Sequence, residues 1–389
     1  MRQKYIVKDR AQRCLTKAID IVGNIFFSFF HIFCRGNREL SNIKKILVIR
    51  IDGIGDVVLS TPAIRLLKEK FPQAHISVLV LPKSKEVLEF NPFINKIIIC
   101  DYDLLGNAWQ SFTFLKELIK ITRRLKEERY DLGIDLRADF TNILIMFFAN
   151  IKYRVSQGIR GGNFLLTHNA PYKEIKHEME RDIDVLIPLN CHYSGALRPE
   201  IFVIEKDKAL AKSLLQKNGI TPKDLLIGFH CGAPWEYRAW PKERFAQLAD
   251  QLIDEYCCKI VIIGGKGEEK LAKEIINLMK HQAVNLTGKL NLRSLAFLIQ
   301  KMDLFICNDG GPMNIASTTN TPVIALFGPQ DPRRFCPFGN TSVFIHKKTP
   351  CSPCNQTVCK LRPTCMERIT VKEVFNKATS ILSRISMLK

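Results

Sequence analysis

The sequence predicts an α/β protein built from two doubly wound, Rossmann-like halves in tandem. Apolar runs of strand length alternate with segments of helical apolar spacing from residue 43 onward, and the alternation starts afresh after Pro199. The length of 389 residues also exceeds a single typical hydrophobic core. We therefore expect a short segment over residues 1–42, an N-terminal domain over 43–195 and a C-terminal domain over 196–389.

In the N-terminal half, the apolar runs predict strands at residues 46–51, 75–81, 96–100 and 130–136, and helical spacing predicts helices from residue 57 and over 108–128. Alternation of this kind builds a parallel sheet with right-handed crossovers. The stretch 152–167 is rich in glycine and basic residues, which favours a solvated surface loop. Arg160 in this loop is a candidate contact for an acceptor substrate.

The C-terminal half repeats the alternation. Strands are expected at residues 225–230, 259–263, 304–307 and 323–327, and helices at 242–256, 268–280, 312–318 and 370–388. Two similar halves of this kind commonly hold a ligand between them.

Composition limits the partners and the compartment. The formal charge of +20 implies an anionic partner, such as a nucleic acid, a phosphorylated lipid or a nucleotide, and the sign alone does not choose among them. Thirteen cysteines without a secretory signal favour a reducing compartment over a disulfide scaffold. We therefore expect a cytoplasmic protein.

The N-terminal segment 1–42 combines basic residues with an aromatic run. The apolar run after Asp20 has only 14 residues, which is too short to cross a bilayer. It suits a helix lying in a membrane interface, with the basic residues on anionic head groups and five phenylalanines pointing inward: Phe26, Phe27, Phe29, Phe30 and Phe33. The alternative is a helix that packs on its own domain.

The first expected strand runs into the loop from Asp52 to Asp56, which opens a helix. Its Gly53 and Gly55 begin a dinucleotide fingerprint, but the third glycine is missing, and Asp56 would repel a pyrophosphate at the helix start. An acid at this place suits a general base, and Gly53 and Gly55 then lie on the acceptor side. The alternative is that Asp56 only caps the helix. A reference pKa of about 4 would keep Asp56 ionised at neutral pH.

Three post-strand loops of the C-terminal half suit a nucleotide diphosphate. Glycines permit a close backbone approach, free N–H groups and an arginine fork bind phosphate, and carboxylates accept hydrogen bonds from ribose. The alternative for each loop taken alone is an ordinary helix start or an exposed surface charge. The candidate donor-binding residues are Ala233, Pro234, Arg238, Glu268, Asp309, Gly310, Gly311 and Asn314.

Three segments together resemble glycosyltransferase family nine, the heptosyltransferases of lipopolysaccharide core assembly: IRIDGIGDVVLSTPAIRLLK, RAWPKERF and NDGGPMNIASTTNTPVIALFGPQDP. The resemblance covers residues 43 to 372. It implies a GT-B fold in which the N-terminal domain holds the acceptor and the C-terminal domain holds a nucleotide-sugar, ADP-heptose in the characterised members. It also implies transfer with inversion at the anomeric carbon.

The resemblance assigns roles to particular residues. The family's general base matches Asp56, and its nucleotide contacts fall at Asp309, Gly310 and Gly311. Its phosphate-binding lysine is Arg238 here, a candidate catalytic residue that would stabilise the negative charge on the departing diphosphate. A histidine that is frequent in the family is Asn314. These departures leave the donor base and sugar open.

The function expected on these grounds is inverting transfer of a sugar, heptose first, from a nucleotide-sugar to a lipopolysaccharide core or related lipid-linked phosphorylated glycan. The reaction would take place at the inner face of the cytoplasmic membrane, without a cofactor. The alternatives are a non-transferase nucleotide-sugar enzyme such as an epimerase and, on charge alone, a nucleic-acid-binding protein. Nucleic acid is not expected, because basic stripes with interleaved aromatic residues are missing.

Two kinds of candidate metal ligand remain. The triplets Asp101-Tyr-Asp103 and Asp182-Ile-Asp184 match the Asp-x-Asp motif of metal-dependent GT-A enzymes, but such triplets arise often by chance. The thiols of Cys351, Cys354, Cys359 and Cys365 suit a structural zinc site, with reduced, packed cysteines as the alternative. No metal is expected in the chemistry.

Overall fold

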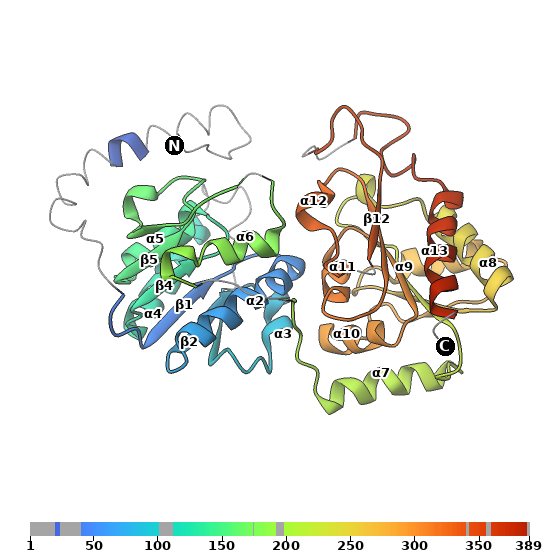
Figure 1. Ribbon diagram of the computed structural model, residues 1–389, viewed down its shortest axis with the longest axis horizontal. Coiled ribbons are helices and arrows are strands. Elements are labelled where there is room, and N and C mark those ends of the chain that lie inside the picture. The colour runs from blue at the N-terminus through green and yellow to red at the C-terminus, as the bar shows by residue number, and fades with distance from the viewer. Residues whose placement is uncertain are drawn as a thin grey trace. The chain divides into compact units, whose positions relative to one another are not determined.

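The computed structural model describes residues 20–23, 40–100, 112–173, 175–191, 198–339, 342–354 and 359–386. The chain divides into two compact units, one up to Pro199 and one from Glu200 onward. Each unit is a parallel sheet flanked by helices (Figure 1).

The sheet of the N-terminal unit has six parallel strands in the order β3-β2-β1-β4-β5-β6. Its central strands are apolar and buried, as expected where helices cover both faces. The 3-2-1-4-5-6 order is that of a doubly wound Rossmann sheet. The strands are β1 (Lys45–Ile49), β2 (His75–Val80), β3 (Lys96–Ile99), β4 (Leu132–Asp135), β5 (Tyr153–Ser156) and β6 (His168–Asn169).

Helices connect these strands: α2 (Ile54–Lys70), α3 (Lys85–Leu88), α4 (Phe112–Glu128), α5 (Phe140–Phe148) and α6 (Glu178–Asp184). Helix α2 packs against α6, and α4 packs against α5. One core cluster joins Leu47 and Ile49 of β1 to Leu125 of α4 and Met146 of α5. The apolar face of α4 therefore explains why its sequence shows helical spacing.

Helix α2 continues through a proline. Pro62 has no N–H to donate to the carbonyl of Val58, one turn earlier. The hydroxyl of Thr61 donates to that carbonyl at 2.8 Å and satisfies it. The helix is therefore unbroken over 17 residues, and its first turn presents Asp56 at the end of β1.

The C-terminal unit repeats the topology. Its sheet order is β12-β11-β10-β7-β8-β9, which is the same 3-2-1-4-5-6 order counted from β7. The strands are β7 (Leu226–His230), β8 (Lys259–Ile263), β9 (Val284–Asn285), β10 (Leu304–Asn308), β11 (Val323–Phe327) and β12 (Val343–His346).

Its helices are α7 (Glu205–Lys217), α8 (Lys242–Tyr256), α9 (Glu269–Leu278), α10 (Leu292–Gln300), α11 (Gly311–Ala316), α12 (Pro332–Phe335) and α13 (Val371–Ser386). Helix α8 contacts both α9 and α13, whereas α10 packs against α7. Trp240 is buried in this core: its ring packs edge-on against Phe245, and its indole N–H donates to the carbonyl of Ile369 at 2.9 Å. Trp240 is therefore a core residue of the C-terminal unit.

The strands predicted from apolar runs are all present, and their ends are displaced by at most two residues. The expectations miss the helices α5, α6, α7 and α10 and the strands β5, β6, β9 and β12. The expected helix at 108–128 begins at Phe112 within the described residues.

The expected solvated loop at 152–167 is wrong. It contains strand β5, and most of its residues are buried. The guanidinium of Arg154 is used within the protein, donating to the carbonyls of Leu165 and Ile151 at 2.6 Å each. Gly158 and Gly162 have φ of +57° and +85°, and a Cβ at Gly162 would meet the ring of Phe140 at 2.8 Å. The glycines therefore serve a packed turn.

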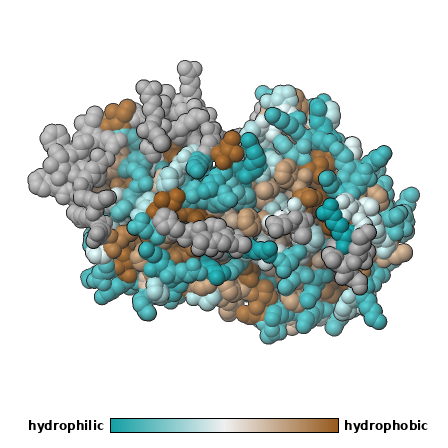
Figure 2. Space-filling model, in the orientation of Figure 1, coloured by the Kyte–Doolittle hydropathy of each residue, from teal (hydrophilic) through white to brown (hydrophobic). Residues whose placement is uncertain are grey.

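Of the N-terminal segment 1–42, most lies outside the described residues, including the five phenylalanines. Asp20 is described: its carboxylate is buried and accepts from the backbone N–H of Gly162 at 2.8 Å. No helix within the described ranges is both long and apolar enough to cross a membrane. The face shown in Figure 2 is mainly hydrophilic, with apolar side chains in scattered patches.

Candidate functional site

Each sheet reverses its strand order once. This switch point lies between β1 and β4 in the N-terminal unit, and between β7 and β10 in the C-terminal unit. Loops leaving the carboxyl ends of the two strands at a switch point form the ligand crevice of doubly wound sheets. The candidate residues Asp56, Arg238 and Asp309 all lie on such loops or on the helix that follows.

Asp56 lies in the first turn of α2, and it is not the helix cap. The N-cap is Gly53, which has no side-chain capping bond, so the capping alternative is wrong. The backbone of Gly53 lies beside the carboxylate, since a Cβ there would be 3.5 Å from Asp56 Oδ2. The side chain of Asp56 keeps 33% of its surface exposed, which leaves one edge of the carboxylate open to a substrate.

Arg50 is a buried cation behind Asp56. Its Nε donates to the backbone carbonyl of Asp56 at 3.3 Å, and its Nη2 lies 3.9 Å from the carboxylate Oδ1. Its Nη1 donates to the carbonyl of Leu136, just after β4, at 2.9 Å. The arginine therefore joins both strands of the switch point to the first turn of α2.

The pKa of Asp56 is raised to about 7. The largest cause is burial, followed by repulsion from Asp52, while Arg50 opposes the rise. The expectation of an ordinary carboxylate pKa of about 4 is therefore wrong. A pKa near neutrality suits a general base, because the group is ionised at pH 7 in a large fraction of molecules and still binds a proton well.

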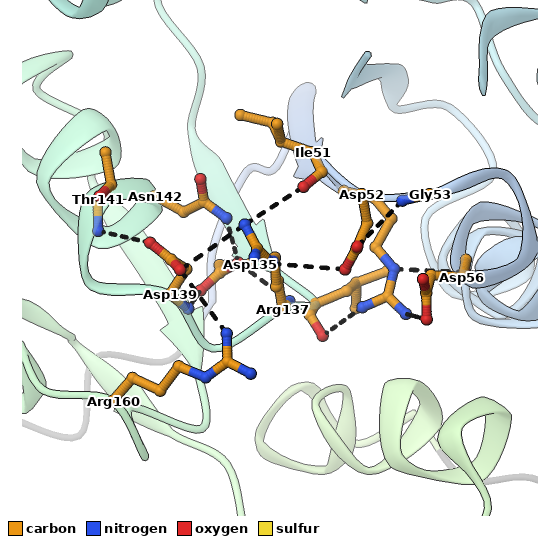
Figure 3. Close-up of polar contacts among 12 residues, drawn as sticks. Ile51, Asp52, Gly53, Asp56, Asp135, Arg137, Asp139, Thr141, Asn142 and Arg160 are labelled. Carbon is orange, nitrogen blue, oxygen red and sulfur yellow. Dashed lines mark hydrogen bonds and ion pairs between the residues drawn. The ribbon is translucent and has the colours of Figure 1, made fainter. Parts of the chain in front are cut away.

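A second arginine, Arg137, follows β4 in the sequence and lies near the Asp56 loop (Figure 3). Arg137 Nε lies 3.5 Å from Asp52 Oδ2, and its Nη1 lies 3.7 Å from Asp139 Oδ2. Arg160 reaches the same Asp139 oxygen at 3.8 Å and is partly exposed. Arg160 is thus connected to the loop of Asp56 through Asp139 and Arg137, and the described residues show no direct contact between Arg160 and Asp56.

Asp135, the last residue of β4, anchors the loop that follows this strand (Figure 3). Its buried carboxylate accepts from the backbone N–H groups of Arg137 and Asp139 at 3.1 and 2.9 Å. It also accepts from Asn142 Nδ2 at 2.9 Å and from Ser156 Oγ at 3.0 Å. Burial raises the pKa of Asp135 to about 6, with these donors opposing the rise. The role of Asp135 is to position the loop.

The Asp182-Ile-Asp184 triplet is no metal motif. Asp182 is buried and lies 3.2 Å from Arg50 Nη2, whereas Asp184 pairs with Lys176 at 2.7 Å. The two carboxylates have separate cationic partners. The other triplet, Asp101-Tyr-Asp103, lies outside the described residues.

Arg238 and Asp309 meet in the C-terminal unit. Arg238 ends the short 3-10 helix Glu236–Arg238 after β7, and its Nη2 lies 2.5 Å from Asp309 Oδ2, which follows β10. The ion pair corrects the expectation of a guanidinium fork that is available only to phosphate. Arg238 Nε is buried and has no hydrogen-bond partner among the described residues, so donor capacity remains. Burial raises the pKa of Asp309, and Arg238 opposes this.

The loop after Asp309 is open to a ligand. A Cβ on Gly310 would meet no atom within 4 Å, although Gly310 needs no special φ. Gly311 begins α11, and Asn314 in its first turn is buried, with its amide Oδ1 unpaired in the described part of the chain. Asn308 ties this loop to the one after β7 by donating to the carbonyl of Cys231 at 2.7 Å.

Glu268 lies against the β7 loop from the third candidate loop. Its carboxylate accepts from the N–H of Gly265 at 2.6 Å and lies 3.4 Å from Nε2 of the buried His230. Burial alone would raise the pKa of Glu268, but these partners outweigh burial and lower it. Ala233 and Pro234 follow in the β7 loop, half-buried and exposed respectively. Within the described residues, no hydrogen bond or ion pair joins Glu268 to Arg238.

The cysteine tail shows no metal arrangement. Cys351, Cys354, Cys359 and Cys365 are not joined in disulfides, and no three His, Cys, Asp or Glu side chains of the described residues are placed to hold a metal ion. Cys365 packs beside Gly328, and the backbone N–H of Cys354 donates to the carbonyl of Pro329 at 2.7 Å.

Several site residues have no role in the sequence-based expectations. Arg50, Asp135 and His230 each stand at the carboxyl end of a buried apolar strand, where a polar residue is a usable signal. Asp182 carries no such signal, because its partner is far away in the sequence.

Two doubly wound parallel sheets of the same strand order, one in each unit, are typical of the GT-B class of two-domain α/β proteins. The chain belongs to glycosyltransferase family 9 (heptosyltransferase), whose model matches residues 118–364. It is a glycosyltransferase.

Similar proteins agree with this assignment. The chain is 30% identical to lipopolysaccharide heptosyltransferase 2 of Salmonella typhimurium over 305 residues, covering 74% of this chain and 84% of the relative. A solved E. coli ADP-heptose LPS heptosyltransferase II has a TM-score of 0.69 at 26% identity, covering 88% of this chain and 99% of the other. A family 9 glycosyltransferase from Veillonella parvula has a TM-score of 0.77 at 23% identity, covering 88% and 98%, and shows the shared fold.

Proposed function

We propose that the protein is an inverting glycosyltransferase that moves heptose from an ADP-heptose-like donor to the lipopolysaccharide core or a related lipid-linked phosphorylated glycan. Family membership and the names of the relatives support the donor and acceptor classes. The single observation that carries the mechanism is the partly exposed carboxylate of Asp56 at a switch point, with its pKa raised to about 7.

Asp56 is the general base. It takes the proton of the acceptor hydroxyl while that oxygen attacks the anomeric carbon, and the bond from this carbon to the phosphate oxygen breaks on the opposite face. Its Gly53–Gly55 loop and Arg160 bind the acceptor. Arg160 and Arg137 suit the phosphates of such an acceptor, because a guanidinium fork matches phosphate geometry.

The C-terminal cluster binds the donor. Arg238, held by Asp309, neutralises the departing diphosphate through its remaining N–H groups, and Gly310 and Gly311 let the backbone approach it. Asn314, Glu268, Ala233 and Pro234 contact the nucleotide and its ribose. The charges of this site come from the protein side chains, so the reaction needs no cofactor.

We place the reaction at the inner face of the cytoplasmic membrane. The proposed acceptor is lipid-linked, and the net charge of +20 suits an anionic head-group surface.

A ligand panel followed by product analysis tests the function. In thermal-shift measurements, ADP and ADP-heptose should raise the melting temperature more than the UDP and GDP counterparts, because only binding to the native state stabilises it. Heptose transfer to heptose-deficient core glycan should give a product of inverted anomeric configuration by NMR. A retained configuration contradicts the mechanism, and a new sugar nucleotide formed without acceptor supports the epimerase alternative.

The pH dependence follows from Asp56. Its folded pKa of about 7 means that kcat/KM should fall about tenfold per pH unit below pH 7 and level off above it. Because folding raises the pKa of Asp56, this group contributes fully to the free energy of unfolding below about pH 4. That contribution is lost as the pH rises through about 7. A profile of kcat/KM from about pH 5 to about pH 9 measures the ascending limb. A limb near pH 4 would contradict the burial of this carboxylate.

A methyl group added at position 232 should displace the carboxylate of Glu268. A Cβ at Gly232 would meet Glu268 Oε1 at 1.6 Å, so Gly232→Ala moves the carboxylate away from His230 and from the Gly265 N–H. We expect donor KM to rise about tenfold, as for a lost charged hydrogen bond, with little change in melting temperature because the side chain is flexible. Gly265→Ala is the control, since its Cβ would lie 3.8 Å from Glu268. Equal KM values in the two variants would remove Glu268 from the donor site.

A further inference from the structure

Arg50, the buried cation behind Asp56, connects the end of β1 to three other elements. The side chain of Arg50 is 3% exposed and leaves the end of β1. Its three nitrogens contact the carbonyl and carboxylate of Asp56 on α2, the carbonyl of Leu136 after β4, and Asp182 on α6. A buried arginine costs free energy to desolvate unless its charge is matched, so its carboxylate partners decide where its field acts.

The carboxylate of Asp182 is the nearer of the two partners. Its Oδ2 lies 3.2 Å from Arg50 Nη2, against 3.9 Å for Asp56 Oδ1, and its side chain is 2% exposed. The packing of α2 against α6 brings both carboxylates to the same guanidinium. Asp182 thus competes with Asp56 for one cation.

Other charges also face Asp56. Asp52 on its own loop and Glu178 on α6 raise its pKa, while Arg137 from the β4 loop lowers it. Burial would lower the pKa of Arg50, but Asp182, Asp52 and Asp56 raise it, so the guanidinium stays charged. Burial also raises the pKa of Asp182, and Arg50 opposes this. The balance among these groups sets the affinity of Asp56 for a proton.

We propose that Arg50 and Asp182 are positioning residues for the catalytic base: Arg50 fixes the first turn of α2 and the Asp56 carboxylate, and Asp182 draws part of the arginine's charge away from it. This inference rests on the proposed function, in which Asp56 is the base. Neither residue reaches the substrate. Arg50 favours the ionised carboxylate, and Asp182 weakens that effect, so that Asp56 holds a proton strongly enough to accept one.

Two substitutions should move Asp56 in opposite directions. Arg50→Met removes the cation and should raise the pKa of Asp56 by about one unit, as for loss of an opposite charge at this distance. Asp182→Asn keeps the shape of the side chain and returns the arginine's field to Asp56, so its pKa should fall by at least about half a unit. Arg50→Lys retains a cation without the three-way fork and should lie between Arg50→Met and the wild type. A merely structural role would not shift the pKa in both directions.

The measurement is direct titration of the Asp56 carboxyl carbon by NMR in aspartate-labelled protein, assigned by its loss in Asp56→Asn. The kcat/KM pH profile is recorded in parallel. Asp184→Asn is the matched control, because it lies on the same helix, is also buried and pairs with Lys176 instead. It should leave the Asp56 titration unchanged. Thermal unfolding verifies that each variant is folded. If Arg50→Met does not fold, Asp182→Asn and its control are sufficient for the test.

The outcomes separate the positioning role of Arg50 and Asp182 from the role of Asp56 as the base. Opposite NMR shifts with matching shifts of the pH profile support both the inference and the base assignment. Opposite NMR shifts without a change in the profile keep Arg50 and Asp182 as positioning residues for Asp56 but remove Asp56 as the base. An Asp56 titration that is unchanged in Asp182→Asn, or that moves equally in Asp184→Asn, overturns the inference.

Discussion

Asp56→Asn should lower kcat by about 10³-fold while donor affinity stays within about twofold of the wild type. The amide has nearly the shape of the carboxylate but cannot accept the hydroxyl proton. Asp56 lies on the N-terminal unit, and the proposed donor contacts lie beyond residue 230. Steady-state kinetics with saturating acceptor, together with calorimetric titration of ADP, measure the two quantities separately.

The control is Asp52→Asn in the same loop. Asp52 raises the pKa of Asp56 by repulsion, so its removal should keep most of the turnover and move the ascending pH limb to lower pH. An equal loss of donor binding and turnover in Asp56→Asn would contradict the base assignment.

Arg238→Met should lower kcat by about 10²- to 10³-fold and weaken ADP binding as well. The substitution removes the cation that we propose neutralises the diphosphate. It also leaves the buried carboxylate of Asp309 without its partner at 2.5 Å, which raises the pKa of Asp309 further and costs stability of about 3–5 kcal/mol. Kinetics and calorimetry on the folded variant, with its melting temperature, measure the three effects.

Arg238→Lys keeps one charge and should recover part of the activity, because a single ammonium cannot hold Asp309 and a diphosphate in the same geometry. Lys242→Met is the matched control, since Lys242 lies four residues further on, is more exposed and pairs with Glu274. A kcat for Arg238→Met equal to that of Lys242→Met would remove Arg238 from the catalytic site.

The acid-base character of Asp56 shows the limit of a reference pKa. The loop from Gly53 to Asp56 is visible in the sequence as a turn between a strand and a helix. Its carboxylate has a pKa of about 7 because burial and Asp52 act on it together, and no local pattern reports the density of atoms around a side chain.

Asp182 shows what a local motif leaves out. Its letters match a metal motif, because the spacing of two aspartates is a local property. The structure gives it a different task, since α6 packs on α2 and places Asp182 against Arg50. Arg154 in the expected surface loop is a similar case, with its charge directed to two carbonyls of its own unit.

The sequence by itself determined the main alternation of strands and helices, the division into two similar halves, and the strand-end positions of Asp56, Arg238 and Asp309. These features depend on apolar periodicity and turn residues, which are local along the chain. Only the tertiary structure decided that Arg238 is paired with Asp309, that Arg50 lies between Asp56 and Asp182, and that Asp56 titrates near neutrality. The reason is that the energy of a buried charge depends on partners from distant elements and on the water excluded around it.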